Sequence, residues 1–281
     1  MNLQKAHNPI LSILKYTLAD EIQHKSFIVL FLICAAFVFL TRGCYNDNFV
    51  MNGQVLNAQA IGWFVSKASF HVIAAAVTLI AALLSMRIFR RDRDEGIQSC
   101  ILAKPIARWQ YVAAKTLGLW MLSLLFMLVL HSIILFITLL NTKTAIFSFL
   151  FASLLCSSNL LFVILAVLFL SLLLPEVIAF LCILGVSIVS YIGDGIYAAS
   201  HSQMAQAMVH QPQGYEQSLT WWQVVYYLWP KLSAVQQWAT ALISGETFRW
   251  TGLVHPLVNV LLYCLLMAFL LFMRFEREDI V

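Results

Sequence analysis

The chain alternates long apolar blocks with short polar segments. A hydrocarbon core of roughly 30 Å is crossed by about 20 helical residues, so each long apolar block predicts one membrane-spanning helix. We predict six such helices, over residues 27–40, 66–86, 117–140, 146–174, 177–193 and 253–273. The first run has only 14 residues and needs residues 25–26 and 41–45 as its interfacial ends. The pattern therefore predicts an all-α integral membrane protein.

The composition excludes an ordinary soluble protein. Apolar residues make up 62% of the chain and charged residues 11%, against roughly 45 to 50% and about 25% in soluble domains. The formal net charge is only +4, so the chain lacks the clustered positive face of a nucleic-acid binder. We predict one transmembrane domain over residues 1–281 and no nucleic-acid partner.

The placement of the cations predicts the orientation. Lys and Arg near the ends of membrane spans are retained in the cytoplasm. Six spans place both termini on one side, and that side carries twelve of the 17 Lys and Arg residues. The distribution predicts cytoplasmic N- and C-termini.

Residues 1–25 are predicted to form an interfacial elbow helix at the membrane surface. Asn8 can cap it and Pro9 suits its first position. An apolar face is formed by Ile10, Leu11, Leu14, Leu18 and Ile22, although Glu21 intrudes on it. The alternative is a frayed, solvated tail.

Residues 87–110 form the charged centre of the chain, between the second and third predicted spans. Their mixed charges favour a helical, salt-bridged surface, while Ile97, Ile101 and Leu102 make a small apolar face that needs a cover. Pro105 is expected to begin the next helix. We interpret this segment as a loop that docks another protein; the alternative is a solvated loop that only fixes the topology.

Within this segment the sequence resembles a known family. The matching residues are Glu95, Gly96, Leu102, Pro105, Ile106, Arg108, Tyr111, Lys115 and Gly118. They resemble the first cytoplasmic loop of ABC-2 type transporter permeases, and residues 275–280 (Phe-Glu-Arg-Glu-Asp-Ile) resemble the tail of that family. The six-span subgroup similar to the permease of the nitrous-oxide reductase maturation system is the nearest. Gln98, Ala107 and Ala114 depart from the family pattern.

The resemblance implies an ABC-2 (type V) exporter-like fold in a bacterial cytoplasmic (inner) membrane. It implies a homodimer of permeases with two ABC-type ATPase subunits, which dock on the loop at residues 87–110. The residues it implies for this coupling are Arg90, Arg91, Arg93, Glu95, Ile97, Ile101, Leu102, Pro105, Arg108 and Lys115. The sequence contains no G-x-x-x-x-G-K-[ST] phosphate-binding loop. We therefore expect no cofactor in this chain, with ATP and Mg²⁺ bound by the partner ATPase, and no enzymatic activity of its own.

The segment 194–251 is predicted to be a long extracytoplasmic loop with interfacial helices. Aromatic rings favour the headgroup level of a membrane. A short helix is predicted from Ser233, as its cap, through Ile243 to Gly245. We interpret the aromatic residues as an outer gate that meets a substrate or a periplasmic partner: Trp221, Trp222, Tyr226, Trp229 and Trp238. The alternative is anchoring to membrane lipid.

Three polar residues within spans are candidates for a translocation pathway: His71, His131 and Asn159. Lys67 lies one helical turn from His71, so the two share a face. The alternatives are snorkelling of Lys67 to the surface and hydrogen bonds between helices.

Other functions have weaker support. His201, Met204, Met208 and His210 are soft ligands that suit Cu(I), but their spacing matches no fixed site, and we predict no metal centre. An intramembrane hydrolase is disfavoured because the sequence has neither H-E-x-x-H nor G-x-S-x-G. The leading hypothesis is an exporter permease. The alternative is a mechanotransmitting permease that passes ATPase motion to an extracytoplasmic partner without transport.

Overall fold

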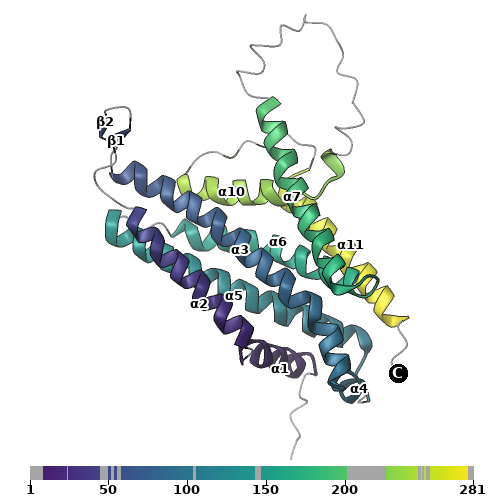
Figure 1. The fold of residues 1–281 in the computed structure, drawn as a ribbon. Coiled ribbons are helices and arrows are strands. Elements are labelled where there is room, and N and C mark those ends of the chain that lie inside the picture. The colour runs from purple at the N-terminus through teal and green to yellow at the C-terminus, as the bar shows by residue number, and fades with distance from the viewer. Residues whose placement is uncertain are drawn as a thin grey trace, which may run out of the picture.

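The computed structural model describes residues 9–23, 25–44, 50–51, 54–55, 58–103, 106–142, 147–200, 226–245, 248, 250 and 254–277. Figure 1 shows a bundle of long helices. The helices are α1 (Pro9–Gln23), α2 (Lys25–Leu40), α3 (Ala58–Asp94), α4 (Ile97–Leu102), α5 (Arg108–Thr142), α6 (Ser148–Ser171), α7 (Glu176–Ser200), α10 (Leu232–Ser244) and α11 (Pro256–Glu276). A 3₁₀ turn, Thr41–Cys44, follows α2, and the two-residue strands β1 (Val50–Met51) and β2 (Gln54–Val55) pair antiparallel.

Helix α6 lies at the centre of the bundle. A helix satisfies its backbone hydrogen bonds internally, whereas the hydrocarbon core of a membrane offers no partners for them. Along most of its length α6 is buried, and it packs against α3, α5, α10 and α11. The apolar run that predicts the fourth span thus forms the core of the fold.

Five of the six predicted spans are helices that are long and apolar enough to cross a membrane: α3, α5, α6, α7 and α11. Helix α2 covers the first predicted span but has only 16 residues. It passes the same test only together with α1, to which it is bent by 65°. Among the described residues, the count is therefore five spans, or six if this bent pair is one of them.

Two helices extend well beyond the membrane thickness. With 37 and 35 residues, α3 and α5 are about 55 and 52 Å long. Figure 1 shows α1, α4 and the C-terminal end of α11 at the same end of the bundle. We call it the basic end, because Arg90, Arg91, Arg93 and Arg108 lie there. The opposite end, which carries Tyr226, Trp229 and Trp238, is the aromatic end.

The predicted loop at residues 87–110 is largely helical. Residues 87–94 continue α3, a turn at Glu95 and Gly96 follows, and α4 comes next. Gly96 has a φ of 70°, a left-handed conformation that glycine adopts without steric cost. The expectation that Pro105 begins the next helix is wrong, since α5 begins at Arg108, where the Gln110 side chain accepts a hydrogen bond from the Ala107 amide. Pro105 itself is outside the described residues.

The face that helix α1 presents to the bundle overlaps only in part with its predicted apolar face, of which Ile10 and Leu18 pack against the core. Its buried residues are Ile13, Thr17 and Glu21, and they face α5. Leu11 and Ile22, from the predicted apolar face, are exposed. Glu21 therefore does not intrude on a lipid-facing surface, because it points into the bundle and binds Arg91.

The predicted short helix of the 194–251 segment is confirmed as α10. It ends at Gly245, whose φ of 68° makes the left-handed C-cap that the sequence predicts. Ser233 is not its N-cap, since α10 begins at Leu232 after Lys231, and Ser233 donates its hydroxyl hydrogen to Asp194 instead. The helix is buried on most sides, packing against α6, α7, α11 and α3.

Candidate functional site

The basic end is built around a buried ion pair between α3 and α5. Asp92 and Lys115 have fully buried side chains, and the Lys115 Nζ lies 2.6 Å from Asp92 Oδ2. The Tyr111 hydroxyl donates a hydrogen bond to the same carboxylate oxygen. The Tyr111 ring stacks on Phe275 of α11, with centroids 5.8 Å apart. One cluster thus joins the ends of three helices.

A second ion-pair cluster joins α1 to α3. Arg91 Nη2 lies 2.5 Å from Asp20 Oδ2 and 2.6 Å from Glu21 Oε1. The Glu21 side chain is nearly fully buried, and those of Arg91 and Asp20 are partly exposed. Charges in a low-dielectric setting attract more strongly than in water. This contact therefore binds α1 to Arg91, the residue of α3 that precedes Asp92.

The outer surface of the basic end carries the remaining charges. Arg90 is 71% exposed and lies 3.7 Å from Asp94 and 3.5 Å from Glu176, the first residue of α7. Arg93 and Glu95 are exposed. A cavity of about 670 Å³ opens here, and its charged lining includes Arg87, Arg90, Arg91, Asp94, Glu95, Glu21 and Glu176.

The predicted coupling residues therefore divide into two groups. Those that face outward are Arg90, Arg93 and Glu95, while Lys115 is buried and Arg91 is partly so. Ile97, Ile101 and Leu102 of α4 are half-buried, so the chain itself covers part of their apolar face. Arg108 donates a hydrogen bond of 2.9 Å to the Glu276 carbonyl at the end of α11.

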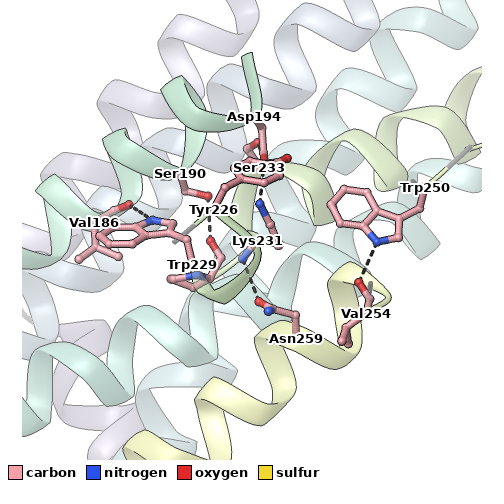
Figure 2. A network of polar contacts seen from close by, with 11 residues as sticks. Val186, Ser190, Asp194, Tyr226, Trp229, Lys231, Ser233, Trp250, Val254 and Asn259 are labelled. Atoms are coloured by element: carbon pink, nitrogen blue, oxygen red, sulfur yellow. Dashed lines mark hydrogen bonds and ion pairs between the residues drawn. The ribbon is translucent and has the colours of Figure 1, made fainter. Parts of the chain in front are cut away.

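Figure 2 shows a third polar cluster, at the aromatic end. Asp194 of α7 is buried, and its carboxylate accepts hydrogen bonds from the Tyr226 and Ser233 hydroxyls. The Lys231 Nζ lies 3.4 Å from Asp194 Oδ1 and over the Tyr226 ring. Lys231 is 3% exposed. Burial lowers the pKa of its ammonium group to about 8, although the Asp194 charge acts in the opposite direction.

Backbone contacts of the same segment fix α10 in place. The Lys231 amide donates to Asn259 of α11, and Ser190 of α7 donates to the Pro230 carbonyl (Figure 2). The Asn159 Nδ2 of α6 donates to the Leu232 carbonyl at 2.8 Å. The start of α10 and the two residues before it are thus bound to three membrane-spanning helices.

The predicted gate residues that the structure describes do not form one cluster, and each contacts different neighbours. Tyr226 is buried against Asp194, and the Trp229 indole donates to the Val186 carbonyl (Figure 2). Trp238 is half-buried, with its ring 4.7 Å from that of His255. Trp221 and Trp222 lie outside the described residues, as do His201, Met204, Met208 and His210. The described part of the chain contains no group of three or more His, Cys, Asp and Glu residues that could hold a metal ion.

The pathway candidates divide between two places. His131 is fully buried, with its Nδ1 2.6 Å from the Ser153 hydroxyl and its ring stacked on Phe70 at 4.4 Å. The Phe70 ring also lies 6.3 Å from that of His71, whose carbonyl accepts from Gln236 Nε2. Asn159 lines a separate cavity between α3, α6, α7 and α10.

Sequence reasoning missed the acidic partners in all three clusters: Asp20, Asp92 and Asp194. The spacing carried a signal for Asp92, since Asp92 lies near the end of α3 and Lys115 near the start of α5, on either side of the connection that contains α4. For Asp194 and Lys231 the signal was weaker, because 36 residues separate them, mostly within the long loop.

The comparison with known families agrees with this architecture. The family model described as ABC-2 family transporter protein matches residues 11–280. The chain therefore belongs to the ABC-2 transporter family and is a multi-pass membrane protein, the permease subunit of an ABC transporter. The family implies an ATPase partner. No curated protein matches the sequence.

Proposed function

We propose that the chain is the permease of an ATP-driven exporter and that a separate ATPase subunit docks at its basic end. The observation that supports this proposal is that exposed charged residues of the α3–α4 turn lie next in sequence to a buried ion pair between α3 and α5. Arg90, Arg93 and Glu95 face outward, while Asp92, one residue from Arg93, is locked to α5 through Lys115. A partner that moves the α3–α4 turn therefore also displaces α5.

The two ion-pair clusters determine which helices move together with α3. A displacement of α3 at Asp92 acts on α5, and a displacement at Arg91 acts on α1. Lys115 is buried, so it positions Asp92 and makes no direct contact with the ATPase. The outward residues and the exposed side of α4 are the contact surface.

The proposed assembly contains two copies of this permease and two ATPases, which bind ATP and Mg²⁺. The basic end faces the cytoplasm of a bacterium, with the chain in the inner membrane. This orientation is supported by the gathering of α1, α4 and the end of α11 at one end of the bundle, with the arginines (Figure 1), because such residues are retained on the cytoplasmic side.

A second function, mechanotransmission to an extracytoplasmic partner, is favoured by one observation at the aromatic end. Helix α10 is fixed to α6, α7 and α11 through Asn159, Asp194 and Asn259. Any rearrangement of these helices moves α10 with them. The same surface serves as an outer gate if a substrate passes, with His71, His131 and Asn159 as its pathway candidates.

Charge reversal at the contact surface tests the proposal. In Arg93→Glu and Glu95→Lys variants, we expect the ATPase to be lost when the tagged permease is purified in mild detergent. Arg42→Glu, an exposed arginine of the 3₁₀ turn after α2, is the matched control and should retain it. Wild-type ATPase recovery and wild-type coupling in both reversed variants would refute docking at this surface.

A further inference from the structure

A cavity of about 390 Å³ lies between α3, α6, α7 and α10. Its size is within the range of sites for small organic ligands. On α3 the lining includes the small side chains of Ala75, Ala76 and Ala82, and on α7 it includes the bulkier Phe180 and Ile183. Among the described residues, the lining contains no charged side chain.

One buried polar atom in this lining has no partner. Asn159 is 7% exposed, and no donor in the described part of the chain reaches its Oδ1. Its Nδ2 donates to the Leu232 carbonyl. If the amide oxygen and nitrogen of Asn159 were exchanged, two acceptor oxygens would face each other. The hydrogen bond to Leu232 therefore shows that Oδ1 is the atom without a partner. A buried acceptor without a donor is costly.

The other polar groups that the described residues contribute to the cavity do not supply the missing donor. Each hydroxyl that lines it already donates its hydrogen within the protein. Thr78 donates to the Ala74 carbonyl, Ser187 to the Ile183 carbonyl and Tyr191 to Gln236 Oε1. Among the described residues no donor remains for Asn159, so a molecule bound in the cavity can supply one.

The mouth of the cavity indicates where that molecule enters. Leu79 and Ile188 line the cavity and are 41% and 48% exposed. Both belong to membrane-spanning helices, so the opening faces hydrocarbon. A molecule that enters here is apolar along most of its length.

We propose that this cavity binds a neutral single-chain amphiphile, whose hydroxyl or amide N–H donates to Asn159 Oδ1 while its apolar chain fills the space between α3 and α7. This inference rests on the proposed exporter function only where the bound amphiphile is taken to be the transported substrate. The binding site itself is independent of an ATPase partner.

The test uses the purified chain in lipid nanodiscs without an ATPase. The probes are a photoactivatable 12-carbon alcohol and its methyl ether, which has no hydrogen to donate. We expect the alcohol to label α3, α6 and α7 around the cavity about threefold or more above the ether, the ratio that one hydrogen bond in a membrane protein supplies. Asn159→Leu should remove this difference.

A cavity-filling variant provides a second readout. Ala76→Phe should abolish labelling by both probes at the cavity. Leu265→Phe on α11, at a residue that is 68% exposed, should leave it unchanged. Equal labelling by alcohol and ether in the wild type would overturn the proposal, as would labelling that Ala76→Phe does not reduce. Either result would show that the cavity holds only water or bulk lipid.

A permease that fails to bind an ATPase but still shows this labelling would refute the proposed function alone. With the ATPase present, stimulation of ATP hydrolysis by the alcohol that is lost in Ala76→Phe identifies a cargo. Labelling without stimulation identifies a resident lipid, and both results uphold the site.

Discussion

At the residue scale, the fold depends on charges that are buried in pairs. Asp92 and Lys115 are both fully buried. Removal of one member leaves the other charge unpaired in a low-dielectric setting, which costs about 3 to 5 kcal/mol. Removal of both leaves no such charge.

Lys115→Met should therefore destabilise the protein by about 3 to 5 kcal/mol, seen as a lower midpoint of thermal unfolding in detergent. The double variant Asp92→Asn with Lys115→Met should recover a large part of this loss. Arg90→Met is the matched control: its side chain is 71% exposed, and we expect a change within about 0.5 kcal/mol. An equal loss in the single and the double variant would contradict the account of the pair.

Lys231 gives the aromatic end a predicted pH dependence. Its pKa is lowered to about 8 by burial, against 10.5 for an ordinary lysine, and the titratable groups beside it are Asp194 and Tyr226. Between these two pH values the unfolded chain binds the proton and the folded chain does not. The contribution of Lys231 to stability therefore rises with pH across this window and is constant below it.

The difference in unfolding midpoint between the wild type and Lys231→Met should accordingly shift in favour of the wild type from about pH 8 to pH 10.5. Subtraction of the variant removes the titration of other groups that the two proteins share. Parallel curves for the two proteins across this window would show that Lys231 is not the buried group described.

The sequence predicted little of these pairs. Arg91 and Lys115 were identified as functional, but as contacts for a partner, whereas they bind Asp20, Glu21 and Asp92 inside the chain. Hydrophobic patterning treats each acidic residue at a helix end as solvated. Only the packing of two helices shows that such a residue faces a cation on its neighbour.

At the element scale, the close approach of α1 to α5 depends on one glycine. A Cβ at Gly118 would lie 3.0 Å from Thr17 Cγ2 on α1, whereas a Cβ at Gly185 of α7 would meet nothing within 4 Å. Overpacking of a tight contact costs about 1 to 3 kcal/mol.

Gly118→Val should lower the unfolding midpoint and loosen α1 from the bundle, detected as faster hydrogen exchange of the α1 amides. Gly185→Ala should be neutral or stabilising, because it adds helix propensity without a clash. An unchanged midpoint and unchanged α1 exchange in Gly118→Val would show that α1 does not lie against α5 as described.

Elements were more predictable than pairs, since membrane-spanning helices require long apolar runs. Helices α3, α5, α6, α7 and α11 were placed by that rule. The apolar-run rule does not cover residues 87–94, where the mixed charges predict a helical surface and α3 does continue as a helix. It also could not show that α10, which has an amphipathic sequence, is buried against four helices.

At the scale of the whole molecule, the proposed function gives each end of the bundle a different role. In that proposal, the basic end receives motion from an ATPase through the α3–α4 turn, and α10 at the aromatic end follows the membrane-spanning helices. The ion pairs join neighbouring helix ends, and we propose that they pass a displacement from one helix to the next.

Photo-crosslinking from Cys100, which is exposed on α4, tests whether an ATPase docks at the basic end. A benzophenone maleimide is attached in native membranes to a variant that keeps only Cys100 and the buried Cys156 and Cys264. We predict that mass spectrometry of the product identifies an ABC-type ATPase. The matched variant that keeps Cys182, which is exposed on the membrane-spanning helix α7, should give none. Products from Cys100 that contain no ATPase would contradict the account.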